Sequence, residues 1–222
     1  MSRPERNREG CTVYLLRHGD SRCDSIRRFI GRSDDPLNET GRAQAEWWCR
    51  QLSHIPFRHI YCSDLIRSRE TARIIGRHIP APLTVLSGLS EIDLGSWDGM
   101  PVSEVRRLFP QHYDSRGADL AGYRPDGGES FFDLSARVLP VFEEVVHHSK
   151  ENLLMVGHAG VNRIILCHLL GMPLTNLFRL EQDYGCLNIL EYKGDVGVVR
   201  RMNIPAEINT NFHACRKRKF PL

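Results

Sequence analysis

The sequence contains no apolar run long enough to cross a membrane. Its apolar stretches, such as residues 153–156, are short and are followed by glycine or polar residues. The charged residues 1–10 are not followed by the apolar core of a targeting signal. We therefore interpret residues 1–10 as a disordered lead-in or linker and expect no contact with a membrane.

Cysteine is present, but not in a pattern that binds metal or builds disulfides. The seven cysteines are an odd number and include no Cys-x-x-Cys pair, which argues against a disulfide framework and against a zinc knuckle. The sequence also lacks the His-Glu-x-x-His pattern of zinc hydrolases. We expect a cytoplasmic protein that uses no metal ion and no other cofactor.

The excess of one sign of charge over the other is also small. The net charge of +3 is too small to indicate nucleic acid binding. Basic residues cluster at 216–219, at the extreme end of the chain, where they predict a solvated basic tail over residues 206–222. We therefore expect no nucleic acid partner.

Length and composition fit one folded domain over residues 11–205. The chain has 222 residues, of which 41% are hydrophobic, and no composition break divides it. Short apolar runs alternate with segments of helical periodicity, which predicts an α/β protein. We expect a mixed, mostly parallel sheet flanked by helices on both faces. The strands are expected at residues 12–16, 59–62, 83–86, 152–156, 186–192 and 196–202, the last two as an antiparallel hairpin at one edge.

Five helices are expected between these strands. They cover residues 37–52, 63–78, 101–109, a segment that begins at Ser130, and 161–170. Ser63 or Asp64 is expected to cap the second helix, and Ser130 with Asp133 to form a capping box. Phe132, Ala136, Leu139, Val141 and Val146 are expected to give the long helix its packing surface, and residues 115–128 to form an irregular flap.

Two histidines follow two apolar strands. His18 stands in Arg17-His18-Gly19 after the first strand, and His158 follows residues 152–156. The carboxyl ends of parallel strands meet at the edge of an open sheet where ligands bind. Arg67 lies in the first turn of a helix that also follows a strand, and helix starts favour anions. We expect these side chains to share one site.

The ordered motifs along the chain resemble the histidine phosphatase superfamily, in its phosphoglycerate mutase-like branch. The motifs are Arg17-His18-Gly19, residues 63–72, Leu89-Ser90-Glu91-Ile92, Gly127-Gly128-Glu129-Ser130 and Gly157-His158. The resemblance runs from about Thr12 to Met202 and implies the phosphoglycerate mutase-like fold. Residues 31–38, 127–130 and 177–180 are also similar to ribazole phosphatases and related small-molecule phosphatases.

The resemblance implies a role for each residue. His18 would be the nucleophile that forms a phosphohistidine. Arg17 and Arg67 would hold the phosphoryl group, because guanidinium forks match phosphate geometry. His158, protonated when phosphate is bound, would add a further donor. Glu91 would be the general acid that protonates the leaving oxygen, with Asp93 as a weaker rival.

Substrate binding is assigned by the same resemblance to Arg28 and Ala159. The loop after the nucleophile departs from the family pattern at Asp24, which replaces an amide, and at Ile30, which replaces a glutamine. A carboxylate at Asp24 would repel phosphate unless it turns away, contacts a hydroxyl, or pairs with Arg27 or Arg28. We therefore assign no phosphate contact to Asp24.

The sequence thus predicts a metal-independent phosphomonoesterase that acts on a small phosphate ester, with ribazole phosphate as a named candidate. A phosphoglycerate mutase is the alternative, although residues 99–126 are short for the insertion that mutases carry. A non-catalytic phosphate-binding module is a third reading. The protein would be a monomer or a homodimer.

Overall fold

A computed structural model describes residues 10–194 and 196–208 of the chain. Of the expected lead-in, only Gly10 falls within the described residues, and of the expected tail only residues 206–208 do. Both therefore remain predictions.

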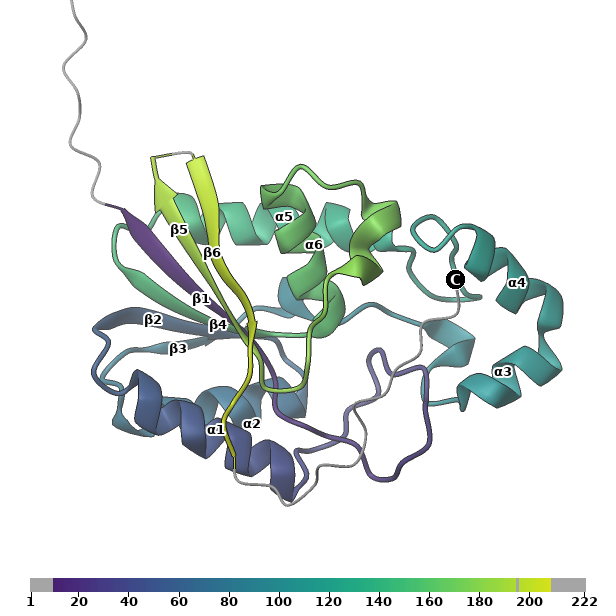
Figure 1. Cartoon of the computed structure of the whole chain (residues 1–222), viewed down its shortest axis with the longest axis horizontal. Helices are drawn as coiled ribbons and strands as arrows, with labels where there is room; N and C mark the ends of the chain where they lie inside the picture. Colours follow the sequence, from purple (N-terminus) through teal and green to yellow (C-terminus); the bar gives the residue numbers. More distant parts are fainter. Residues whose placement is uncertain (1–9, 195, 209–222) are drawn as a thin grey trace, which may run out of the picture.

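The core of the fold is one six-stranded sheet with the strand order β3-β2-β4-β1-β5-β6 (Figure 1). Its first four strands in this order run parallel, whereas β5 is antiparallel to β1 and β6 is antiparallel to β5. The predicted hairpin at one edge is confirmed, as is the predicted mixed, mostly parallel sheet. The strands are β1 Cys11–Arg17, β2 Phe57–Cys62, β3 Leu83–Val85, β4 Asn152–Gly157, β5 Leu187–Lys193 and β6 Val196–Ile204.

Helices cover both faces of the sheet, as predicted. In Figure 1, α1 and α2 lie on one face, α5 and α6 lie on the other, and α3 and α4 lie past the ends of β1 and β4. The helices are α1 Glu39–Leu52, α2 Ile66–Ile75, α3 Val102–Leu108, α4 Pro110–Ala118, α5 Phe131–His147 and α6 Ala159–Leu169.

Burial on both faces explains why the central strands are apolar throughout. Val13 and Leu15 of β1 belong to the core under α5 and α6, whereas Leu16 belongs to the core under α1 and α2. Leu154 and Val156 of β4 join that second core. Alternate side chains of a strand point to opposite faces, so a strand covered on both sides needs an unbroken apolar run.

The capping box of α5 is confirmed, and its predicted packing face is correct at Leu139, Val141 and Val146 but wrong at Phe132 and Ala136. Ser130 accepts a hydrogen bond from the Asp133 backbone, and the Asp133 carboxylate accepts one from Ser130. Phe132 is 55% exposed and Ala136 is exposed, while Leu139 and Val141 are partly buried and Val146 is buried. The buried face consists of Phe131, Leu134, Val138, Phe142 and Val146. Phe131, next to Phe132, takes the inward position at helical spacing.

The predicted cap of α2 was also wrong. The helix starts at Ile66, with Leu65 in the capping position and no side-chain cap. Ser63 instead hydrogen-bonds His158, and Asp64 accepts a hydrogen bond from Ser90. Ser63 Oγ also accepts a hydrogen bond from Leu65 N at 3.3 Å, but neither side chain bonds a backbone N–H within α2. The regular helix ends at Ile75 and is followed by a short 3-10 turn.

The predicted irregular flap is partly helical. Helix α4 covers Pro110–Ala118, so the first part of residues 115–128 continues a helix. Pro110 is the first residue of α4, a position where proline loses no hydrogen bond and its fixed φ favours the helix. We expected the helix that precedes the flap to end at Phe109, but a second helix starts immediately after it.

Two glycines bring the start of α1 against the loop that follows β1. A Cβ on Gly41 would clash with the carbonyl oxygen of Asp20, and a Cβ on Gly19 would clash with the Gly41 backbone. Asn38 caps α1 by accepting a hydrogen bond from Gly41 N, and its own N–H donates to Asp20 O at 2.9 Å. This close approach fixes the backbone directly after His18.

We predict that Gly41→Ala destabilises the protein, because the added methyl group must displace the backbone at Asp20. Overpacking of this kind costs about 1–3 kcal/mol in the free energy of unfolding, measurable by urea titration. Gly117→Ala in α4 is the matched control, since a Cβ there meets nothing within 4 Å. Equal stability of the two variants would contradict the prediction.

Candidate active site

His18 follows directly on β1 and is held as a neutral imidazole. Its Nδ1 lies 2.7 Å from the carbonyl oxygen of Gly19, which can only accept, so Nδ1 carries the proton. The Nε2 lone pair accepts a hydrogen bond from Arg67 Nε at 3.2 Å. Burial lowers the pKa of His18 well below its usual value, and the nearby charges of His158, Arg67 and Arg17 lower it further. The side chain is oriented as a nucleophile would need to be.

The register between β1 and β4 places His158 next to His18. Arg17 pairs with Gly157 across the two strands, so the residues that follow them lie side by side. The two imidazole rings are 5.0 Å apart between centroids. His158 is fully buried, and its Nε2 shares a hydrogen bond of 2.6 Å with Ser63 Oγ.

The other ring nitrogen of His158 is unsatisfied. Its Nδ1 is buried and has no hydrogen-bond partner among the described residues. Burial lowers the pKa of His158 well below its usual value, and the positive charges of Arg67 and Arg17 add to the effect. The ring is therefore neutral in the free protein, and an anion brought to these arginines would favour its protonation.

Arg67, in the first turn of α2, connects this helix to the loop of residues 31–33. Its side chain is 1% exposed, and its guanidinium donates to the carbonyl oxygens of Gly31, at 2.6 Å, and of Ser33. Asp98 holds the same loop by accepting from the backbone N–H groups of Gly31 and Ser33 at 2.9 and 2.8 Å. Arg67 therefore has a fixed position beside His18.

Arg17 is held by residues from the far end of the chain. Its guanidinium donates to the carbonyl oxygen of Gln182 at 2.6 Å and lies 3.6 Å from the centroid of the Tyr184 ring. The Gln182 side chain donates to Asn188 Oδ1 at 2.9 Å, and Asn188 donates to Leu15 O at 3.0 Å. This buried amide network joins the start of β5 to the end of β1.

Glu91 is held by backbone N–H groups rather than by a cation. Gly160 N donates to its Oε2 at 3.0 Å and Ile92 N donates to Oε1 at 2.9 Å. A Cβ on Gly160 would clash with the carboxylate, so only glycine leaves room for it. The rival Asp93 instead accepts from Gly95 N at 2.9 Å within its own turn.

The segment that carries Glu91 is fixed by Arg137 of α5. Arg137 donates to the carbonyl oxygens of Ser90 and Glu91, at 3.0 and 3.3 Å. It also binds both carboxylate oxygens of Glu129, at 2.9 and 2.8 Å. Glu129 belongs to the Gly-Gly-Glu-Ser motif, so this motif stabilises the backbone at Glu91 through Arg137.

The structure brings the five predicted catalytic residues, His18, Glu91, His158, Arg17 and Arg67, into one cluster. The two predicted substrate-binding residues are not part of its contacts. Arg28 donates to Asp24 at 3.0 Å and to Gly99 O at 3.2 Å, which selects one of the partners considered for Asp24. Ala159 is the first residue of α6, directly after His158. Their roles in binding remain predictions.

Sequence reasoning missed Ser63, Tyr184, Gln182 and Arg137. Ser63 follows the end of β2, so the rule that drew attention to the two histidines also applied to it. The other three carry no local signal, because their contacts join residues that are distant along the chain.

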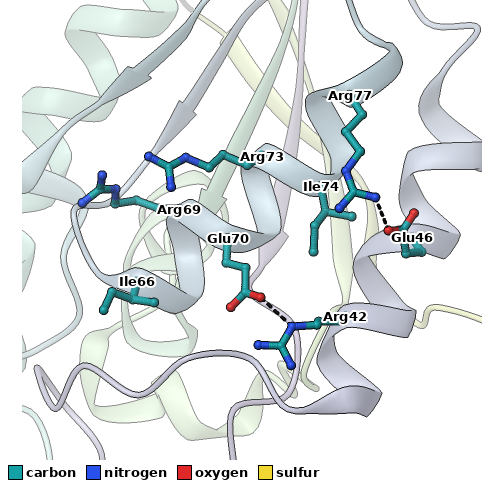
Figure 2. Close-up of a pocket in the computed structure, with 8 residues that line it drawn as sticks. All are labelled: Arg42, Glu46, Ile66, Arg69, Glu70, Arg73, Ile74 and Arg77. Atoms are coloured by element: carbon teal, nitrogen blue, oxygen red, sulfur yellow. Dashed lines mark hydrogen bonds and ion pairs between the residues drawn. The ribbon is translucent and has the colours of Figure 1, made fainter.

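A surface pocket of about 560 Å³ lies elsewhere, between α1 and α2 (Figure 2). It is rich in arginine, but Arg42 pairs with Glu70 at 2.6 Å and Arg77 pairs with Glu46. None of the five clustered residues lines it. We therefore do not assign it to the candidate active site.

Three features are absent from the part of the chain that the structure describes. Over residues 10–194 and 196–208, no three His, Cys, Asp or Glu side chains lie together as metal ligands. The six cysteines in these ranges are free. Within the same ranges, no helix is both long and apolar enough to cross a membrane.

Comparison with known proteins points to one family. The family model described as "Histidine phosphatase superfamily (branch 1)" matches residues 13–205. An adenosylcobalamin/alpha-ribazole phosphatase from Salmonella typhimurium is 29% identical over 180 residues, which cover 81% of this chain and 89% of that protein. A glucosyl-3-phosphoglycerate phosphatase from Mycolicibacterium vanbaalenii is 33% identical over 174 residues, with 74% and 76% covered.

The solved structures agree with this result. The structure of Bacillus stearothermophilus YhfR superposes with a TM-score of 0.80 at 30% identity and covers 87% of this chain and 97% of that one. The expected phosphoglycerate mutase-like fold is therefore confirmed.

The buried histidines predict a stability that declines in acid. Their pKa values are lower in the folded chain than the value of about 6.5 in the unfolded chain, so below that pH the unfolded chain binds more protons. The free energy of unfolding should fall with decreasing pH by up to about 1.4 kcal/mol per pH unit for each histidine. Urea titrations between about pH 7.5 and 5.5 would measure this slope.

His158→Gln should make this decline shallower, because one of the two groups is removed. His54→Gln, at an exposed position, is the control and should leave the slope unchanged. The same slope in His158→Gln as in the unaltered protein would contradict the assignment.

Proposed function

The chain belongs to the histidine phosphatase superfamily, and on that premise we propose that it is a metal-independent phosphomonoesterase that works through a phosphohistidine. One observation carries this proposal. His18 presents an unprotonated Nε2 beside Arg67, with His158 next to it and Glu91 in the same cluster. Nucleophile, anion-binding donors and a proton carrier are thus present together.

In the first step, His18 Nε2 attacks phosphorus and forms an N–P bond while the bond from phosphorus to the ester oxygen breaks. Glu91, as the carboxylic acid, gives its proton to the departing oxygen, which leaves as an alcohol. Arg67 must turn its Nε–H from His18 to a phosphoryl oxygen before the attack, because that donor now occupies the lone pair. Arg17 and a protonated His158 would stabilise the remaining phosphoryl oxygens.

In the second step, the Glu91 carboxylate takes a proton from water, and the water oxygen attacks phosphorus. The N–P bond breaks, which returns neutral His18 and releases inorganic phosphate. Glu91 recovers its proton in this step and is ready for the next ester. Its two backbone donors and the contact of Arg137 with the Glu91 carbonyl hold this side chain and its segment in one position.

The proposed substrate is a small phosphate ester. Two of the similar proteins are named an adenosylcobalamin/alpha-ribazole phosphatase and a glucosyl-3-phosphoglycerate phosphatase, which supports a small-molecule ester as substrate. Ribazole phosphate is the candidate that the motif similarity supports.

We predict that the protein releases phosphate from esters in the presence of a chelator and that His18→Ala loses roughly a thousandfold or more in kcat. Phosphate release from a panel of ribazole phosphate, phosphoglycerates, sugar phosphates and nucleotides would measure this. Rapid quenching should trap an acid-labile phosphoenzyme whose mass exceeds that of the protein by one phosphoryl group. His54→Ala is the control at an exposed histidine. Activity retained in His18→Ala would refute the mechanism.

Glu91→Gln should slow the reaction by roughly a hundredfold to ten-thousandfold for alkyl phosphates, because the alcohol then leaves without a proton. The loss should be smaller for p-nitrophenyl phosphate, whose leaving group needs no protonation. Asp93→Asn is the matched control, since Asp93 binds its own turn. A larger loss in Asp93→Asn than in Glu91→Gln would assign the acid to Asp93.

A further inference from the structure

We propose that Tyr184 is a further catalytic residue of the phosphoryl site, and that its hydroxyl donates a hydrogen bond to a phosphoryl oxygen held by Arg17 and Arg67. This inference rests on the proposed function, because it adds a donor to that reaction. It starts from an aromatic side chain that lies beside His18 and that the proposed mechanism does not use. Tyrosine hydroxyl groups are among the donors that stabilise charge developing in a transition state.

Tyr184 is presented by a tight turn that is bound to the backbone of the nucleophile. Gly185 N donates to His18 O at 2.9 Å. On the other side of the turn, Gln44 Nε2 donates to Tyr184 O at 2.9 Å and Trp48 Nε1 donates to Gly185 O at 2.6 Å. Gly185 has a φ of 66°, and a Cβ there would clash with the Gln44 side chain. The turn is therefore fixed relative to His18, and so is the start of the side chain that it carries.

The Tyr184 ring lies among the groups that would bind and attack the phosphoryl group. The guanidinium carbon of Arg17 is 3.6 Å from the centroid of this ring, and that of Arg22 is 5.2 Å from it. The imidazole ring of His18 is 5.6 Å away between centroids. The close contact with the Arg17 guanidinium holds the tyrosine ring in one orientation next to the nucleophile.

The hydroxyl end of Tyr184 lies near Arg67. Burial lowers the pKa of Arg67, and the charges of Glu91, Asp34 and Tyr184 oppose this shift. The hydroxyl is the group of Tyr184 that can carry a charge, and such an effect weakens as the distance grows. One end of this side chain is therefore close to Arg67, while its ring contacts Arg17.

The Tyr184 hydroxyl is an unused donor. It has no hydrogen-bond partner within residues 10–194 and 196–208. By contrast, the hydroxyl of Tyr123 shares a hydrogen bond of 3.0 Å with His112 Nδ1. Tyr184 is partly exposed, so its hydroxyl is open to a ligand. Guanidinium groups offer no acceptor, and a phosphoryl oxygen bound to them would supply one.

A donor at this position would act in both steps of the proposed reaction. A phosphoryl oxygen that binds Arg17 and Arg67 would come within reach of the hydroxyl, because Tyr184 contacts the first arginine and lies near the second. Tyr184 donates without giving up its proton, so the proton balance of each step is unchanged. A hydrogen bond to an anionic oxygen is stronger than one between neutral groups, and this donor adds no further positive charge.

Tyr184→Phe removes the hydroxyl and keeps the ring beside Arg17, so it tests the hydrogen bond alone. We expect kcat/KM for p-nitrophenyl phosphate to fall by roughly tenfold to a hundredfold, the range for one hydrogen bond to a charged group. The dissociation constant for inorganic phosphate, measured by calorimetry in the presence of a chelator, should rise as well. Tyr61→Phe is the matched control, since Tyr61 lies on β2 and is also partly exposed.

A double-mutant cycle with Arg17→Met separates a direct contact from an effect that acts through Arg17. If the hydroxyl binds the phosphoryl oxygen, Tyr184→Phe should weaken phosphate binding by a similar factor whether residue 17 is arginine or methionine. A loss that disappears in the Arg17→Met background would show that the hydroxyl only orients Arg17, which overturns the proposal. The dissociation constants do not depend on how much of a variant folds.

The outcomes also separate this contact from the phosphatase itself. Equal kcat/KM and equal phosphate affinity in Tyr184→Phe and in the unaltered protein would overturn the contact and leave the phosphatase standing. An equal loss in Tyr61→Phe would overturn it too, because the effect would not be specific to the site. No phosphate release from any ester would overturn the proposed function, whereas phosphate binding would still test the contact.

Discussion

The parallel pairing of β1 with β4 is the contact on which the site depends. Because Arg17 lies opposite Gly157, the two histidines leave the sheet at the same level and their rings come within 5.0 Å. A shift of one residue would turn every side chain of β1 to the opposite face. Val13 and Leu15 pack in one core and Leu16 packs in the other, so such a shift would exchange side chains between two closely packed cores. The packing of the sheet and the geometry of the site are therefore fixed by the same contacts.

The site concentrates positive charge where water is scarce. Arg17 and Arg67 lie beside two buried histidines, and the guanidinium groups are oriented by carbonyl oxygens instead of carboxylates. A carboxylate partner would neutralise an arginine before phosphate arrived, whereas a carbonyl oxygen orients it and leaves its charge available. Glu91 is likewise held by backbone N–H groups, and its carboxylate forms no ion pair with the described residues.

Local patterns located the strands and most of the helices and drew attention to Arg17, His18, Arg67 and His158, whereas Glu91 was assigned by the family resemblance. Apolar runs located the strands, and polar residues directly after β1 and β4 marked the edge where they meet. The sequence patterns gave a wrong prediction where a short polar side chain could hydrogen-bond either a nearby helix end or a residue distant along the chain. Ser63 could have capped α2, but it binds His158, 95 residues away. The inward face of α5 was misjudged because Phe131 and Phe132 are adjacent and both apolar, and only the surrounding core selects between them.

The buried amide network of Gln182 and Asn188 connects Arg17 of β1 to β5 and β6. Arg17 is oriented by Gln182, which binds Asn188, and Asn188 in turn accepts a hydrogen bond from Asn203 N at 3.0 Å. Chains are synthesised from the amino terminus, and these partners are among the last described residues to leave the ribosome. A nascent chain can already contain His18, Glu91 and His158 and still lack the contacts that orient Arg17. The contacts that orient Arg17 can therefore form only after residues 182–203 have been synthesised.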